Sequence, residues 1–210
     1  MGREENVVKY YVLCNKLKKV IRKGWIDWQV KRDRIESVAE HIFGVQQLAI
    51  AMYSEFEYDI DLTKVILMLS VHEIEEIVIG DLTQFDISQA EKEVLGHKAV
   101  EKVLGNLIDG DKIKELILEF DERKTKEAIF AYHCDKFECD IQCKIYDEEN
   151  CVDMTEQENN KVYHNERVQE IIKNGDNSWS DMWLEFDRPK YSDENFIKVL
   201  NYVKKNNITK

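Results

Sequence analysis

The chain has 210 residues, of which 43% are hydrophobic, 34% are charged and one is a proline. This length suits one domain, or one domain with a tail, and the composition favours a soluble, helical protein. The net charge of -12 disfavours binding to nucleic acid polymers or anionic membranes, because both need a basic protein surface.

The sequence predicts neither a membrane span nor a secretory signal. No segment approaches the roughly 18 consecutive apolar residues of a spanning helix, and the N-terminus lacks the apolar core of a signal peptide. The five cysteines are therefore expected to stay reduced. We expect a cytoplasmic protein that has no membrane partner.

Apolar residues recur at helical spacing along most of the chain, and no strand-like alternation persists. The first helix is expected to end at Gly24, and Ser37 with Glu40 predicts a capping box at the start of the second. In chain order, the predicted helices cover about 6–22, 36–55, 62–79, 88–108 (as one helix or two), 112–121, 125–150, 155–174 and 192–206. We expect an all-α fold.

The domain organisation is predicted as one main domain and a tail. The main domain is expected over residues 1–175, and the tail over 176–210 carries a helix. Trp179 and Trp183 are four residues apart and predict an apolar anchor. We expect this anchor to dock the tail on the core or on a partner subunit.

The stretch VHEIEEIVIGDLT, Val71–Thr83, combines acids and an imidazole with an apolar helix pattern. Ionised carboxylates on an apolar face are costly unless they are paired or bound to a metal. His72 and Glu76 are four residues apart and share a helix face, whereas Glu75 is turned away and is expected to be solvated. The functional candidates in this stretch are His72, Glu73, Glu76 and Asp81.

Two residues from other predicted helices extend this set, His41 and Asp135. Two imidazoles and two carboxylates from three helices suit a divalent transition metal. Such a metal lowers the pKa of a bound water towards about 7, and a neighbouring carboxylate can then move a proton. Taken singly, each residue also fits an ordinary role, since a lone helical histidine is more often a core or surface residue.

Other metal motifs fail at their ligands. The segment HEIEE differs from the zinc-protease pattern H-E-x-x-H because residue 76 is Glu. Cys139 and Cys143 lie on one predicted helix without a C-x-x-C pair, so they are expected to be packing residues.

The combined order of motifs resembles the HD-domain metal-dependent phosphohydrolases. The motifs are E-S-V-A-E-H at Glu36–His41, H-E-x-x-E-x-x-x-G-D at His72–Asp81 and D-K-F-E at Asp135–Glu138. Within that family, the chain is similar to the YfbR-like or HDDC-type 5′-deoxynucleotidases, from about Val7 to Asn150. The resemblance implies an HD-domain helical bundle, to which this chain adds a C-terminal helical tail.

The resemblance also implies roles for individual residues. His41, His72 and Asp135 match the metal ligands of the family. Glu76 matches its catalytic carboxylate, and Asp81 matches a second acid that assists.

Around the substrate, Trp25 matches a tryptophan that lines the pocket. Arg22, Lys23 and Arg34 are the basic side chains expected to offset phosphate charge.

One position departs from the family pattern. The family carries Asp after the second histidine, and this chain carries Glu73. Glutamate can bind the same metals with one more methylene to place. Glu73 is therefore interpreted either as a metal ligand or as the mark of a weakened or repurposed site.

The function implied is hydrolysis of (deoxy)ribonucleoside 5′-monophosphates to nucleoside and phosphate. It would use one divalent metal ion, which could be Mn, Co, Zn, Fe, Ni or Mg, in a homodimer. One alternative is an HD-type hydrolase of a cyclic nucleotide, a triphosphate or a guanosine alarmone. The other is a non-catalytic nucleotide sensor.

Overall fold

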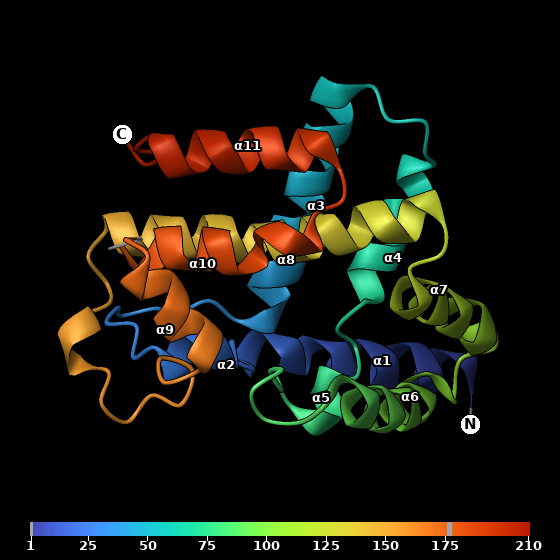
Figure 1. Ribbon diagram of the computed structural model, residues 1–210. Helices are drawn as coiled ribbons and strands as arrows, with labels where there is room; N and C mark the ends of the chain where they lie inside the picture. Colours follow the sequence, from blue (N-terminus) through green and yellow to red (C-terminus); the bar gives the residue numbers. More distant parts are fainter. Residues whose placement is uncertain (1, 176–177) are drawn as a thin grey trace. The chain divides into compact units, whose positions relative to one another are not determined.

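The computed structural model describes residues 2–175 and 178–210, and helices dominate its secondary structure (Figure 1). Within these ranges no strand forms, and one isolated bridge joins Ile21 to Ser37. The all-α prediction is confirmed. No described helix combines the length and the apolar character needed to cross a bilayer.

Contacts divide the chain into two compact units. The first comprises residues 1–23 and 36–132, and the second comprises 24–35 and 133–210. Helix α8, Lys126–Glu148, begins in the first unit and ends in the second. The predicted division into 1–175 and 176–210 stays a prediction, and residues 176 and 177 lie outside the described residues.

The other helices are short to medium in length. The first unit holds α1 (Arg3–Cys14), the 3-10 helix η1 (Asn15–Lys19), α3 (Val38–Phe56), α4 (Leu62–Val71), α5 (Glu76–Ile79), α6 (Gln89–Leu104) and α7 (Gly110–Glu122). The second unit holds most of α2 (Lys23–Asp27), then η2 (Met154–Glu156), α9 (Glu166–Lys173), α10 (Trp179–Asp187), η3 (Arg188–Lys190) and α11 (Glu194–Lys205).

The capping box at the start of α3 is present as predicted. The Ser37 hydroxyl accepts a hydrogen bond from the Glu40 N–H, and the Glu40 carboxylate accepts one from the Ser37 N–H. These bonds satisfy amides that a helix N-terminus leaves unpaired. They fix the first turn of α3, and His41 directly follows Glu40 in that turn.

The predicted helix over 62–79 is interrupted at residues 72–75. The His72 imidazole lies 2.8 Å from the Leu69 carbonyl oxygen, which a continued α-helix would offer to the Glu73 N–H. The following turn uses three-residue spacing, with the Glu76 N–H donating to the Glu73 carbonyl at 3.2 Å. His72 and Glu76 therefore do not share one regular α-helical face.

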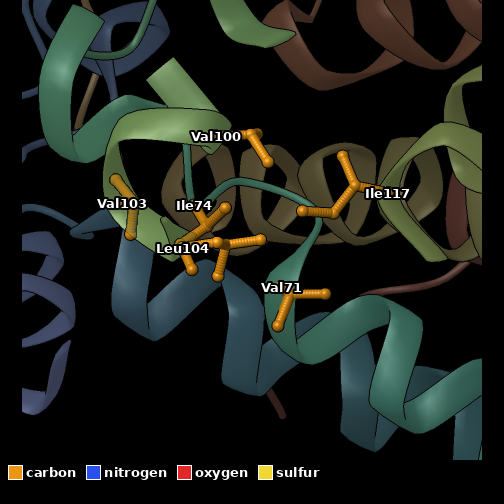
Figure 2. Packing of buried hydrophobic residues seen from close by; sticks show 6 residues of the cluster. All are labelled: Val71, Ile74, Val100, Val103, Leu104 and Ile117. Carbon is orange, nitrogen blue, oxygen red and sulfur yellow. The ribbon is translucent and has the colours of Figure 1, made fainter. Parts of the chain in front are cut away.

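A hydrophobic cluster holds this interrupted segment in place. Val71 and Ile74, on either side of His72 and Glu73, are 6% and 2% exposed. They pack with residues of α6 and α7, namely Val100, Val103, Leu104 and Ile117 (Figure 2). Burying a valine or isoleucine side chain contributes about 1.5–3 kcal/mol, so this packing fixes the backbone between them.

The second unit is organised by aromatic side chains. The Trp179 ring lies 5.9 Å from that of Trp25 and 5.7 Å from that of Trp28, and the Trp183 ring lies 5.9 Å from that of Trp28. Such pairs stabilise beyond the area that they bury. Residues 179–187 form α10, a helix that the periodicity did not predict.

Two predicted helix ends are wrong. The first helix ends at Cys14 and continues as η1, so Gly24 is not its cap and lies inside α2. Of the predicted helix over 155–174, only α9 is α-helical, and η2 covers its first two residues. The Asn165 side chain accepts the N–H groups of Arg167 and Val168 and starts a new helix there.

Candidate metal centre and active site

Three predicted metal ligands meet in the first unit. His41 on α3 is 0% exposed, and His72 and Glu73 after α4 are 4% and 7% exposed. One ligand atom from each lies within 4.8 Å of the others. Glu73 Oε1 is 4.0 Å from His41 Nε2 and 3.9 Å from His72 Nε2. Two imidazoles and a carboxylate converge on one small buried volume.

The His72 ring is oriented for metal binding. With Nδ1 at hydrogen-bond distance from the Leu69 carbonyl oxygen, the proton is placed on Nδ1 and the lone pair on Nε2. Histidine ligands of metals are commonly oriented in this way. The Phe120 ring packs edge-on against the imidazole with 5.2 Å between centroids. The residues present therefore fit a divalent metal.

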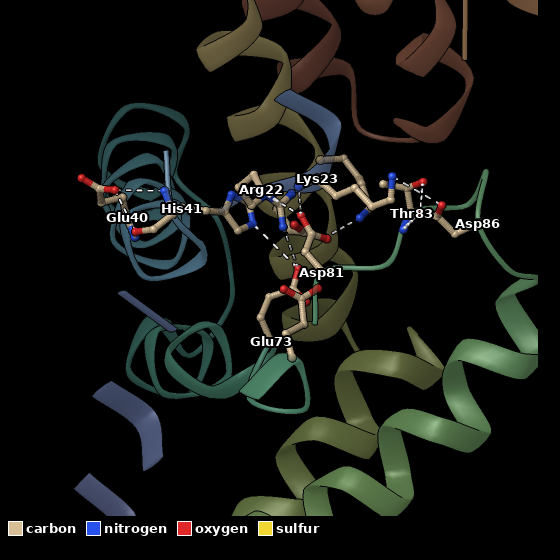
Figure 3. A network of polar contacts seen from close by, with 12 residues as sticks. Arg22, Lys23, Glu40, His41, Glu73, Asp81, Thr83 and Asp86 are labelled. Carbon is tan, nitrogen blue, oxygen red and sulfur yellow. Dashed lines mark hydrogen bonds and ion pairs between the residues drawn. The ribbon is translucent and has the colours of Figure 1, made fainter. Parts of the chain in front are cut away.

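Arg22 connects the carboxylates of this region (Figure 3). Its Nη1 lies 3.3 Å from Glu73 Oε1, and its Nε lies 3.8 Å from Asp81 Oδ2. The Lys23 N–H donates to the same Asp81 oxygen at 2.7 Å. Asp81 can turn back in this way because Gly80 has a φ of 74°, in the region that favours glycine.

Lys23 also reaches a second acid. Its Nζ lies 3.6 Å from Asp86 Oδ1. The other oxygen of Asp86 accepts hydrogen bonds from the N–H and the hydroxyl of Thr83, at 2.9 and 2.8 Å (Figure 3). The loop after Asp81 is thereby folded around a fixed carboxylate.

Glu76 is the most deeply enclosed acid of the site, with 1% exposure. Its Oε1 lies 3.4 Å from the Nζ of Lys92 on α6. Burial, followed by the charges of Glu73 and Asp81, raises the pKa of Glu76 well above its usual range, while Arg22 and Lys92 oppose the shift. A carboxyl group with a raised pKa can hold a proton that an ordinary carboxylate would give up.

Glu75 differs from its expectation. It was predicted to be solvated, but it is partly buried, and its side chain lies against Gly96 of α6. Burial, together with the charge of Glu73, raises the pKa of Glu75 to about 8. The break in the helix at residues 72–75 turns this side chain inward.

The remaining predicted residues lie in the second unit. Asp135 on α8 is 2% exposed, with an oxygen 2.8 Å from Lys136 Nζ. Trp25 is 6% exposed, and its ring meets that of Tyr146 edge-on at 5.3 Å. Arg34 is exposed.

Lys92 is the residue of this site that sequence reasoning missed. It is one lysine among many on amphipathic helices, and nothing in its spacing separates it from a solvated residue. Only the packing of α5 against α6 brings it to Glu76.

Comparisons with known proteins agree with this geometry. The model of the HD domain family matches residues 14–174. The chain belongs to the HD domain family. It is 30% identical over 152 residues to a protein of Dictyostelium discoideum named 5′-deoxynucleotidase HDDC2, covering 69% of this chain and 79% of the relative. The protein of that name from Danio rerio is 27% identical over 69% of this chain and 71% of the relative.

Solved structures share the fold. A "predicted metal-dependent phosphohydrolase" from Magnetospirillum magnetotacticum MS-1 has a TM-score of 0.65 and 22% identity, covering 96% of this chain and 90% of that one. A conserved hypothetical protein from Pyrococcus furiosus has a TM-score of 0.64 and 21% identity, covering 95% and 99%. The predicted membership of the HD-domain phosphohydrolases is confirmed, and the chain is a metal-dependent hydrolase.

Proposed function

We propose that this HD-domain protein hydrolyses (deoxy)ribonucleoside 5′-monophosphates to nucleoside and phosphate. The observation that carries the proposal is the buried cluster of His41, His72 and Glu73, with Arg22 joining Glu73 to Asp81. The substrate class follows the relatives, which are named 5′-deoxynucleotidases.

In this proposal His41, His72 and Glu73 hold one divalent metal, and Asp135 is the fourth ligand that the family resemblance implies. When bound, the metal withdraws charge from a phosphate oxygen and acidifies a water molecule. The two imidazole donors favour Mn, Co, Zn, Fe or Ni over Mg, which prefers oxygen ligands.

The acids beside the cluster handle protons. Hydrolysis forms a bond from the water oxygen to phosphorus and breaks the bond from phosphorus to the 5′-oxygen, which leaves with a proton. Glu76 takes the proton of the attacking water, and its raised pKa lets it hold that proton. Asp81, anchored by the Lys23 N–H, shares the transfer to the 5′-oxygen.

Basic and aromatic side chains recognise the substrate. Arg22 and Lys23 offset phosphate charge, as does Arg34. Trp25 packs on base or sugar, and its neighbours Tyr146 and Trp179 would fix the orientation of its ring for that contact.

The test is turnover of the deoxy- and ribonucleoside 5′-monophosphates with Mn, Co, Zn, Fe, Ni and Mg, with nucleoside and phosphate measured as products. We expect activity with a transition metal, and we expect it to fall by at least about 100-fold in His72→Ala and Glu76→Gln. Activity near the wild-type level in either variant would overturn the proposed mechanism. Turnover of only a cyclic nucleotide, a triphosphate or an alarmone would overturn the substrate class. Metal binding without any turnover would indicate a nucleotide sensor.

Two finer expectations belong to this proposal. The chain acts as a homodimer, as the family resemblance implies, which light scattering on the eluted protein checks. It acts in the cytoplasm, which microscopy of a tagged chain checks.

A further inference from the structure

We infer that Lys92 is a positioning residue that fixes the Glu76 carboxylate for the reaction. The inference deepens the proposed function and rests on it. Lys92 lies outside the family motifs in the sequence, and it acts through its ion pair with Glu76.

The two oxygens of Glu76 have different surroundings. Oε1 receives the Lys92 ammonium at 3.4 Å. Oε2 is buried and has no hydrogen-bond partner among the described residues. The Glu76 side chain is 0% exposed, so bulk water does not solvate the carboxylate.

This asymmetry is expected of a carboxylate that binds a ligand. Buried polar atoms are nearly always hydrogen-bonded in folded proteins, so a buried carboxylate oxygen without a protein partner indicates a water or ligand as its partner. With Oε1 held by Lys92, the rotation of the carboxylate is restricted and Oε2 is presented to the attacking water.

The position of Lys92 is itself well determined. It lies in the first turn of α6, which a capping box between Ser88 and Glu91 begins. The same helix contributes Val100, Val103 and Leu104 to the hydrophobic cluster that holds Ile74 (Figure 2). Lys92 and the segment leading to Glu76 are therefore held by one packed core.

A purely structural role would have other consequences. If Lys92 only compensated buried acids, its loss would lower stability and leave the catalytic rate of the folded enzyme intact. If it positions Glu76, its loss lowers kcat and leaves KM and metal binding unchanged. Arginine, which keeps the charge, would then restore part of kcat.

The experiment compares Lys92→Gln and Lys92→Arg with Lys98→Gln, the same neutralisation at an exposed position of the same helix. Using the nucleoside monophosphate and metal that give the highest wild-type turnover, we expect Lys92→Gln to lower kcat by about 100-fold, the cost of misplacing a reacting group by about an ångström. KM and the metal dissociation constant should not change, and Lys98→Gln should match the wild type. In a Glu76→Gln background, Lys92→Gln should have no further effect.

The inference would be overturned if Lys92→Gln lowered kcat by the same factor in the wild-type and Glu76→Gln backgrounds. It would also be overturned if Lys92→Gln lowered only the melting temperature. Two different results distinguish failure of this inference from failure of the proposed function. The proposed function fails if the wild type turns over no nucleoside monophosphate. The positioning role fails if a crystal structure of Lys92→Gln shows the Glu76 side chain in its wild-type position.

Discussion

Each unit of the chain buries a carboxylate, Asp140 in the second unit and Glu76 in the first, and the two carboxylates differ in their partners. In the second unit, Asp140 Oδ2 accepts the Tyr191 hydroxyl at 2.6 Å. In the first unit, Glu76 keeps one oxygen without a partner among the described residues.

In the proposed function, this difference separates a structural acid, Asp140, from a catalytic one, Glu76. The hydrogen-bond donor to Asp140 comes from the chain itself, so this acid holds the segment around Tyr191. Glu73 sits instead among two imidazoles and an arginine, an arrangement that leaves donors for a metal. A raised pKa alone does not tell them apart, because burial raises the pKa of both Asp140 and Glu76.

The sharpest test of this contrast is neutralisation of one acid in each unit. Glu76→Gln should lower kcat by about 10²- to 10⁴-fold, because a group that transfers a proton is lost. Asp140→Asn should leave kcat unchanged. Steady-state kinetics on both variants measures this, and equal losses would show that the contrast has no functional meaning.

The next largest expected effect is on metal affinity, at residue 73, where this chain has Glu and the family has Asp. Glu73→Asp should weaken metal binding by about 10- to 100-fold, because the shorter side chain withdraws Oε1 from His41, His72 and the supporting Arg22. Titration calorimetry with Mn²⁺ measures the affinity, with Glu55→Asp, at an exposed position of α3, as the matched control. Tighter binding by Glu73→Asp would mean that Glu73 is a poor ligand in this chain.

In the second unit, Tyr191→Phe should act on stability. The change removes the donor to buried Asp140 and should lower the free energy of unfolding by about 1–3 kcal/mol. Denaturant titration measures it, and Tyr202→Phe, at a residue that is 63% exposed, should have no effect. A loss of kcat without a loss of stability would contradict the structural assignment.

The pH dependence of stability should follow from Asp140. Burial, followed by the charge of Asp187, raises its pKa well above the usual range. The folded state therefore binds this proton more tightly than the unfolded state, and the stabilisation is complete only below the unfolded pKa of about 3.9. It is lost as pH rises through the folded pKa. Asp140→Asn should gain stability relative to the wild type as pH rises, and unfolding curves at several pH values would show a fixed difference if this is wrong.

Much of the fold could be predicted because local signals specify it. The Ser37–Glu40 box marks the start of α3, and apolar periodicity locates α7 and α8 within two residues. The break at residues 72–75 could not be predicted, since it depends on a side chain competing for a backbone carbonyl and on packing against α6 and α7.

The site shows the same limit. His41, His72 and Glu73 could be singled out because imidazole and carboxylate are unusual in apolar helix patterns, and the structure brings these three together. Lys92 could not be singled out, because the sequence around a helical lysine does not indicate which residue it pairs with. The inward turn of Glu75 also depends on tertiary packing, with Gly96 leaving room for its side chain.

The distribution of tryptophan has a spectroscopic consequence. All four indoles, Trp25, Trp28, Trp179 and Trp183, belong to the second unit. Intrinsic emission excited at the red edge of indole absorption therefore reports on that unit alone, whereas far-ultraviolet circular dichroism reports on helices of both. Coincident melting curves from the two signals would mean that the two units unfold together. Curves with different midpoints would mean that the two units unfold in separate transitions.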